Sequence, residues 1–170
     1  MKNLPPLLWI SPCGEYRVRI LRRCFLRMQR LAAKHSPDEV GTSLAGRYDE
    51  NGHEAVIASL GPLTPDSVGT QFTFTRGIAG LWDFFESIRR RFRGSRYRVG
   101  EWHSHPSAVP IASATDDRNQ MELALAVSEK LPEAVLIIVG GDLAKRPSLR
   151  VYVYSRERGK IRLHAAAQKQ

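Results

Sequence analysis

The stretch VGEWHSHPSAVPIASATDD, residues 99–117, places two histidines one residue apart directly after an apolar, aromatic run. His103 and His105 stand at positions i and i+2, and the two-residue period of a strand would put both imidazoles on one face, close enough to share a metal ion. Pro106 is expected to end that strand and turn the chain away. Asp116 follows the loop 106–115, which is long enough to return its carboxylate to the strand end. The segment therefore predicts a three-ligand metal site.

Each part of this segment also has a simpler explanation. An isolated H-x-H pair is a weak metal signal, because single histidine pairs are common on strands. Ser113 and Asp116, three residues apart ahead of the apolar run MELALAV, fit a helix capping box. Taken alone, this spacing favours the cap over the metal site. The segment by itself leaves both interpretations open.

The composition is that of one globular domain spanning residues 1–170. The length allows a buried core, and the 42% hydrophobic content argues against disorder. No run approaches the roughly 18 apolar residues of a membrane helix, and the N-terminal segment lacks a signal-peptide core, so we expect a cytoplasmic protein with no membrane span. Two cysteines are too few for a disulfide framework. Cys24 lies on an apolar helical face and is expected in the core.

The net charge of +9 is the unusual bulk feature. Arginine supplies most of it, in the segments RVRILRRCFLRMQR and RRRFRGSRYR. Such a surface favours acidic partners, which could be nucleic acid, a nucleotide-binding protein or an acidic protein face. Solvated helix faces are the simpler explanation of each cluster, and no nucleic-acid-binding motif accompanies the charge. We therefore do not expect nucleic acid to be the main partner.

Hydrophobic periodicity predicts a mostly antiparallel sheet with flanking helices, that is, one α/β domain. Amphipathic helices are expected at 18–33, 78–92 and 116–130. Strands are expected at 7–11, on both sides of the turn at 49–52, at 71–75 and 97–103, and in the segments AVLIIVGG, LRVYVYS and KIRLHAA. The apolar face of the second helix is expected to comprise Ile78, Leu81, Trp82, Phe85, Ile88 and Phe92.

The combined pattern H-x-H-P followed by S-x-x-D resembles the signature of the JAMM (MPN+) zinc metalloproteases, which include the prokaryotic JAB proteins. His103, His105, Ser113 and Asp116 match it in full. The family also has an upstream glutamate in a segment like E-x-G-x-x-x-x-G, and EVGTSLAG, which begins at Glu39, matches that pattern. The resemblance covers most of the chain. It implies a JAMM/MPN (cytidine-deaminase-like) α/β sandwich, with a mostly antiparallel mixed sheet flanked by about three helices.

The resemblance also implies roles for these residues. His103, His105 and Asp116 would hold one Zn²⁺ per chain, with a catalytic water as the fourth ligand. Glu39 would take the proton of that water and deliver it to the leaving amine, and Ser113 would hydrogen-bond the developing oxyanion. The implied reaction is hydrolysis of an amide or isopeptide bond after an extended C-terminal tail, which could add to a sheet edge.

Other glutamates compete with Glu39 for the role of base. Glu50 and Glu54 lie at the turn or beyond it and lack the glycine pattern. Glu101 is the more serious rival, because it shares the face of the two histidines. It is also a candidate acceptor for an imidazole N–H group. Glu39 remains the preferred base.

Among small bacterial members, GEWHSHP, the LLWIS strand and the arginine-rich first helix look most like the deconjugating proteases of type II CBASS anti-phage operons. There, an E1/E2-like ligase joins the C-terminus of a cyclic-nucleotide synthase to target amines, and the protease reverses the link. Bacterial ubiquitin-like conjugation operons use a similar enzyme. The implied substrate is a conjugate of a synthase or of a ubiquitin-like protein, and the ligase of the same operon is a candidate partner.

Two functions of other classes compete with the protease. One is a RadC-like, DNA-associated JAB-domain protein, which the positive charge favours. Against it, the chain lacks both the N-terminal helical domain and the glycine after Ser107. The other is a non-catalytic MPN scaffold that only binds partners. Such scaffolds lose zinc ligands, whereas all the catalytic positions are present here.

Overall fold

The computed structural model describes residues 5–106, 108–126, 133–143 and 145–167. The helices are α1 (Arg22–His35), α2 (Leu81–Arg91) and α3 (Ala114–Ala126). The strands are β1 (Leu7–Ile10), β2 (Arg17–Ile20), β3 (Gly41–Tyr48), β4 (Glu54–Leu60), β5 (Val68–Gly69), β6 (Phe74–Thr75), β7 (Tyr97–Pro106), β8 (Glu133–Asp142), β9 (Arg146–Ser155) and β10 (Gly159–Ala165).

The main sheet closes on itself as a barrel in the order β1-β10-β9-β8-β7-β3-β4-β2. Its neighbouring strands are antiparallel except for β7 with β8 and β2 with β4, which run parallel. The mostly antiparallel mixed sheet of an α/β domain is therefore confirmed, but the expected sandwich is replaced by a barrel. Closure comes from the β1–β2 hairpin, because β1 pairs with β10 while β2 pairs with β4.

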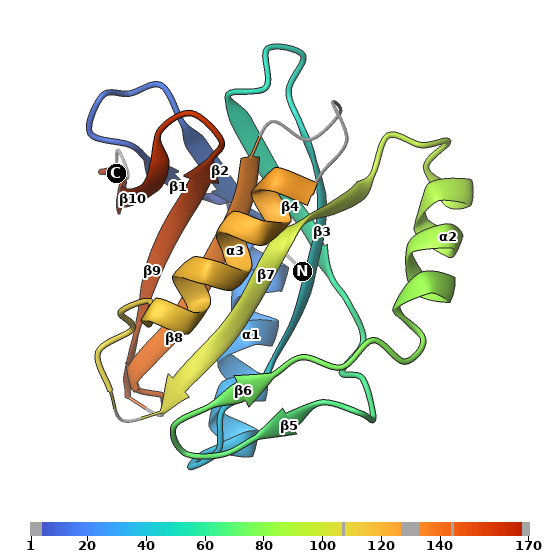
Figure 1. The fold of residues 1–170 in the computed structure, drawn as a ribbon. Helices are drawn as coiled ribbons and strands as arrows, with labels where there is room; N and C mark the ends of the chain where they lie inside the picture. The colour runs from blue at the N-terminus through green and yellow to red at the C-terminus, as the bar shows by residue number, and fades with distance from the viewer. Residues whose placement is uncertain (1–4, 107, 127–132, 144, 168–170) are drawn as a thin grey trace.

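The two faces of the sheet bury separate hydrophobic clusters. On the inner face, Cys24, Met28 and Ala32 of α1 pack with strand residues that include Trp102. On the outer face, Ala124 of α3 packs against β8 and β9. Figure 1 shows α3 in front of the sheet and α1 behind it. The expected core position of Cys24 is thus confirmed, and the sheet is held between two helices.

The first helix begins later than its periodicity predicted. The segment Arg17–Ile20 is strand β2, in which Val18 and Ile20 are buried. Arg19, between them, reaches Glu54 on β4 with an Nε–Oε1 distance of 2.6 Å. The sequence of these four residues fits either a strand or a helix, and it is their pairing with β4 that makes them a strand. The predicted helical start at residues 18–20 is therefore wrong.

Helix α2 stands beside the barrel rather than on a face of the sheet (Figure 1). Of its predicted apolar face, Leu81 and Ile88 are buried. Ile78 and Trp82 are instead 72% and 77% exposed. The predicted packing of this face is thus only half correct, and α2 presents apolar side chains to solvent.

Boundaries of a strand and of the third helix also differ from the predictions. The strand expected at 71–75 is confined to β6, which pairs with β5 in a separate two-stranded sheet. Helix α3 begins at Ala114, two residues early, and the part predicted for 127–130 lies outside the described residues. In the described part of the chain, every helix is too short or too polar to cross a lipid bilayer.

Candidate metal centre

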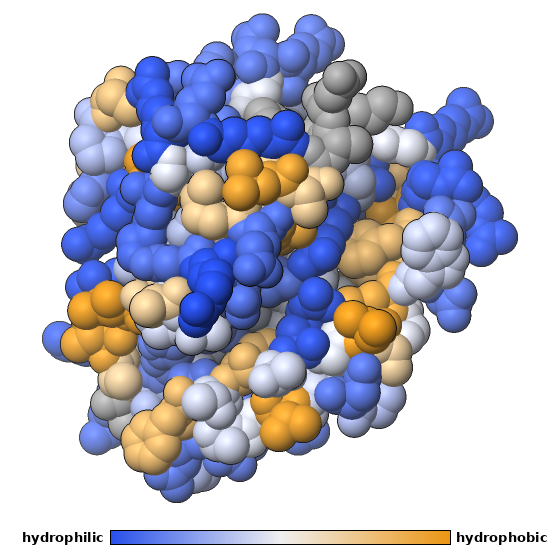
Figure 2. Space-filling view, viewed as in Figure 1, coloured by the Kyte–Doolittle hydropathy of each residue, from blue (hydrophilic) through white to orange (hydrophobic). Residues whose placement is uncertain are grey.

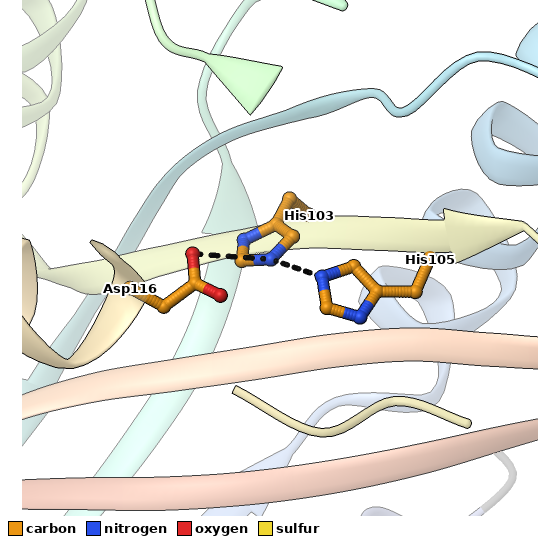
Figure 3. Close-up of side chains that lie close together, drawn as sticks. All are labelled: His103, His105 and Asp116. Carbon is orange, nitrogen blue, oxygen red and sulfur yellow. Dashed lines mark hydrogen bonds and ion pairs between the residues drawn. The ribbon is translucent and has the colours of Figure 1, made fainter. Parts of the chain in front are cut away.

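Strand β7 presents its two histidines on the same face, as the two-residue alternation predicted, and ends at Pro106. The Nε2 atoms of His103 and His105 lie 3.0 Å apart. Nε2 of His103 lies 3.5 Å from Oδ1 of Asp116, which projects from the first turn of α3 (Figure 3). The candidate ligand atoms of these three residues all lie within 4.8 Å of one another. The structure thus brings together the three predicted ligands.

Asp116 also caps its own helix. Its Oδ2 atom accepts hydrogen bonds from the backbone N–H of Ser113 at 2.8 Å and from the Ser113 hydroxyl at 2.7 Å. The Ser113 hydroxyl oxygen in turn accepts from the backbone N–H of Asp116 at 3.1 Å. The capping box and the ligand position therefore coexist, because each uses a different carboxylate oxygen.

Glu39 enters the same cluster from the segment just before β3. Its Oε1 lies 3.7 Å from Nε2 of His105, and only 8% of the residue is exposed. Burial raises the pKa of Glu39 to about 7, the neighbouring His103 lowers it, and the charge of Asp116 raises it further. The structure thus places the predicted base beside the predicted ligands.

Two backbone contacts fix where Glu39 lies. Its N–H donates to the carbonyl of Thr70 at 2.8 Å, which ties it to the β5–β6 hairpin. The next residue, Val40, donates its N–H to the hydroxyl of Ser104 at 3.0 Å and accepts from the Ser104 N–H at 2.8 Å. Ser104 is the residue between the two histidines, and its side chain points to the opposite face. This role of Ser104 was not predicted from the sequence, in which the serine between the two histidines is the available signal.

Gly41, the first glycine of the upstream pattern, occupies a position with no space for a side chain. A Cβ at Gly41 would lie 2.7 Å from the Cβ of His103 and 2.8 Å from Cε1 of Phe74, and closer still to the backbone oxygen of Trp102. Only glycine lets β3 approach β7 at the position opposite His103, with which it pairs. The ring of Phe74 stacks on that of His103 with centroids 6.3 Å apart. Gly41 therefore allows the close packing around the first histidine.

Glu101, the rival base, is committed to other partners. Its Oε1 accepts from Nε of Arg76 at 2.6 Å and also from Arg98. Its Oε2 accepts from the side-chain amide of Gln120 at 3.2 Å. Within the described residues, Glu101 makes its hydrogen bonds to these three side chains and none to an imidazole, so the suggested histidine hydrogen bond is not observed.

Local electrostatics suit a cation at this cluster. Burial lowers the pKa of His105, and the adjacent His103 lowers it further, so the neutral, ligating form of this imidazole is favoured. Burial alone would raise the pKa of Asp116, but His103 and the hydrogen bonds from Ser113 outweigh it and hold that pKa below its usual range. Two imidazoles and one carboxylate form a donor set that borderline divalent metals accept.

An open pocket of 480 Å³ gives access to these groups. Its wall includes Glu39, His105, Ser113 and Asp116, together with residues 71–75 of the β5–β6 hairpin. Four of the five predicted site residues thus line one cavity. His103 lines an adjoining pocket on the α3 side, which shares Asp116.

The family described as prokaryotic homologues of the JAB domain matches residues 21–153, most of the chain. The chain belongs to this family. The match spans α1 through most of β9, and therefore includes Glu39, both histidines, Ser113 and Asp116. The resemblance inferred from the sequence pattern is confirmed.

Two individual proteins extend this JAB assignment. A protein of Enterobacter hormaechei subsp. hoffmannii (strain UCI 50), named CD-NTase/cGAS isopeptidase, is 33% identical over 161 residues, covering 95% of this chain and 88% of that protein. The solution structure of a Desulfitobacterium hafniense protein matches with a TM-score of 0.53 at 19% identity, covering 86% of this chain and 88% of the other. The second similarity concerns the fold alone.

Proposed function

We propose that this JAB-family protein is a metal-dependent isopeptidase that releases a CD-NTase from a conjugate formed through its C-terminus. The observation that carries the proposal is the meeting of Glu39, His105 and Asp116 in one open pocket, with His103 completing the cluster. The similarity to a named CD-NTase/cGAS isopeptidase supports the substrate class and favours it over a ubiquitin-like protein. The complete ligand set supports an enzyme rather than a non-catalytic scaffold. The E1/E2-like ligase remains a predicted partner.

Zinc is the metal we infer, because two imidazoles and a carboxylate form a catalytic zinc set with room for a further ligand. When bound, zinc supplies Lewis acidity and makes water a stronger nucleophile near neutral pH. His103, His105 and Asp116 would hold it. The Oδ2 atom of Asp116 would remain in the cap, so that α3 orients the ligating oxygen.

Glu39 is the proposed proton carrier. Its carboxylate lies at the rim of the ligand cluster on the pocket side, where it can take a proton from water and return it to the leaving amine. The Thr70 and Ser104 contacts around it hold its backbone still, so the carboxylate needs little reorganisation. The side chain would therefore act as base and then as acid.

Ser113 is the proposed oxyanion donor. In this structure its hydroxyl donates to Asp116, so it must rotate away from the carboxylate to donate to a substrate oxygen. The backbone N–H of Ser113 also donates to Asp116 and can maintain the cap during that rotation. The helix start would thus survive the change of partner.

The substrate tail would bind along β6. This strand forms part of the pocket wall, and within the described residues it pairs only with β5. An extended tail added to its other edge would run past Phe74, which packs on His103. The scissile carbonyl would then face Glu39 and the ligand cluster.

The decisive test uses a CD-NTase whose C-terminal tail is fused to a reporter protein. We expect wild-type protein loaded with zinc to cut at the end of the tail, and a chelator to stop cleavage until zinc is restored. Glu39→Gln should retain one zinc per chain and lose about 100-fold or more in kcat, because a carboxylate base contributes on this scale. Glu50→Gln, at an exposed turn, is the matched control. Cleavage that resists chelation, or an active Glu39→Gln variant, would contradict the mechanism.

A further inference from the structure

A basic groove runs between α2 and the start of β7. It has a volume of 730 Å³ and is lined by α2, by the turn that follows, and by the first residues of β7. Its charged lining comprises five arginines and one glutamate: Arg89, Arg90, Arg93, Arg96, Arg98 and Glu86. We call it the α2 groove. Arg89 pairs with Glu86 and Arg98 pairs with Glu101, which lies outside the groove, so the other three arginines leave the groove with a net positive charge.

The arginines of the α2 groove are only partly neutralised. Glu86 forms two 2.9 Å contacts with Arg89 and leaves the others without its charge. The side chain of Arg93 has no hydrogen-bond or ion-pair partner within the described part of the chain. Arg96 stacks its guanidinium 3.7 Å over the ring of Phe92. Burial and nearby arginines together lower the pKa of Arg96, which agrees with an excess of positive charge here.

Aromatic side chains add contact area to this charge. Trp82 is 77% exposed, and it lines the groove together with Phe85. On the side of the molecule that carries α2, hydrophilic side chains lie next to pale and orange ones (Figure 2). Exposed tryptophan beside arginine is the composition of protein-binding hot spots. This apolar aromatic area favours an acidic protein surface, which can bury it, over the phosphate backbone of a nucleic acid, which offers charge alone.

The α2 groove connects with the metal centre. Arg98 lines the groove and also lines the pocket that contains His103 and Asp116. Arg98 and His103 lie on the same strand, five residues apart, which is roughly 17 Å for an extended chain. A tail of about five residues can therefore span the distance from the groove to the catalytic pocket.

We propose that the α2 groove docks an acidic surface on the folded body of the conjugated protein while the tail enters the catalytic pocket. This inference rests on the proposed isopeptidase function and adds a second recognition site to it. The arginines attract and orient the body, and Trp82 supplies the buried apolar anchor. Recognition thus depends on the body as well as on the tail sequence.

Docking is tested separately from cleavage. The Glu39→Gln protein is titrated with a CD-NTase lacking its tail, and binding is measured by calorimetry at low and high salt. Adding Arg89→Glu and Arg93→Glu should weaken binding at least tenfold and reduce its salt dependence, because two attractive charges become repulsive. Arg30→Glu with Arg162→Glu changes the net charge equally at exposed positions outside the groove and should have little effect.

A second measurement compares cleavage of two substrates by a groove variant that carries Arg89→Glu and Arg93→Glu but retains Glu39. The groove variant should lose at least tenfold in kcat/KM on the full fusion, and should cleave a short tail peptide within about twofold of wild type. Equal losses on both substrates, or unchanged binding of the tail-less body, would overturn the docking site. Binding of single-stranded DNA that the groove variant abolishes, with no binding of the body, would also overturn it. Normal docking with no cleavage would instead refute the proposed function alone. Arg89→Ala with Arg93→Ala, a milder pair, guards against misfolding.

Discussion

Asp116 shows how one side chain serves two purposes. Oδ2 completes the capping box with Ser113, while Oδ1 faces His103. The sequence pattern S-x-x-D suggested two competing interpretations, but the carboxylate has two oxygens, so the observed cap is compatible with the proposed ligand role. The spacing therefore follows from geometry, because the residue three positions after the cap points back over the helix start.

Replacing Asp116 by asparagine separates these two roles. Asparagine keeps an oxygen that can accept the cap hydrogen bonds but loses the negative charge that a divalent ion requires. We expect the free energy of unfolding of Asp116→Asn to lie within about 1 kcal/mol of that of wild type, and its affinity for zinc to be at least tenfold lower. Competitive chelator titration and circular dichroism measure the two effects. Asp117→Asn is the control, since the Asp117 carboxylate accepts hydrogen bonds from Lys160 and Tyr154 and lies outside the ligand cluster. If the Asp116 and Asp117 variants bound zinc with equal affinity, Asp116 would not be a ligand.

At the residue level, the sequence predicted the members of the cluster but not the residues that support it. His103, His105 and Glu39 follow from spacing and resemblance, because their side chains share chemistry that short motifs record. Ser104 was missed because its hydroxyl reaches a backbone N–H far away in the chain, and no local pattern reports such a contact. Glu101 was placed on the correct face, but its ion pairs with Arg76, from outside the strand, and with Arg98, three residues earlier on β7, were not predicted.

At the scale of elements, the site depends on how closely β3 approaches β7. Gly41 sits opposite His103 in the register and leaves no space for a side chain. Gly46, at the far end of the upstream motif, similarly packs against the backbone of Val56 on β4. Both glycines of the motif are thus contact points between strands.

Adding one methyl group at Gly41 should therefore disturb the metal centre. We expect Gly41→Ala to lower the free energy of unfolding by about 1–3 kcal/mol, because overpacking pushes strands apart. It should also weaken zinc binding by moving His103. Denaturant unfolding and zinc titration test this. Ser43→Ala, two residues further along β3, is the control: it removes a buried hydroxyl that lacks a partner within the described residues and should leave zinc affinity unchanged. If Gly41→Ala also left zinc affinity unchanged, the close packing at Gly41 would not be needed for the metal site.

Element prediction failed where tertiary pairing overrode local pattern. The RVRI segment fits either a helix or a strand, and its parallel pairing with β4 is invisible in the sequence. The apolar residues at 78–92 predicted a buried face, yet Trp82 of α2 and Ile78, which precedes the helix, remain exposed because α2 packs beside β7 at the edge of the barrel rather than on a face of the sheet. The strand that carries the H-x-H pair and the continuous apolar run of β8 were predicted correctly. In β8 the reason is that burial is nearly complete, which an unbroken apolar run records.

At the scale of the molecule, three glutamates from distant segments gather near one end of the barrel. Glu133 at the start of β8 is 8% exposed, and its Oε2 atom is buried without a hydrogen-bond partner within the described residues. Burial, followed by the charges of Glu15 and Glu157, raises the pKa of Glu133 to about 7. Folding thus favours the protonated form of this carboxyl.

This predicts stability that falls as the pH rises. The protonated carboxyl contributes fully below its unfolded pKa of about 4.5, and the contribution is lost as the pH rises through about 7. Glu133→Gln, which stays neutral, should be about 1–3 kcal/mol more stable than wild type at pH 8 and nearly equal to it at pH 4. Thermal melts of the zinc-free proteins across this range measure the difference. Glu122→Gln, at an exposed position, serves as the control. If Glu133→Gln increased the free energy of unfolding by the same amount at every pH, ionisation of Glu133 would not be the cause.

The global fold was predictable in its class and family but not in its closure. The order of elements along the chain matches the family pattern, which is why the resemblance could be recognised. Closure depends on β1 meeting β10 across nearly the whole chain length, through only two paired positions. A short hairpin gives no local sign of what lies on its other side.

Barrel closure also affects how the protein behaves in a crowded mixture of other chains. Exposed strand edges recruit foreign strands and start aggregation. In this protein the edge strands of the main sheet pair with each other and close the barrel, whereas the short β5–β6 pair, beside the pocket that contains Glu39, keeps its edges unpaired within the described residues. Backbone pairing with other polypeptides would thereby be confined to the β5–β6 pair, beside the pocket in which we propose that cleavage occurs, and non-productive pairing along the main sheet would be suppressed.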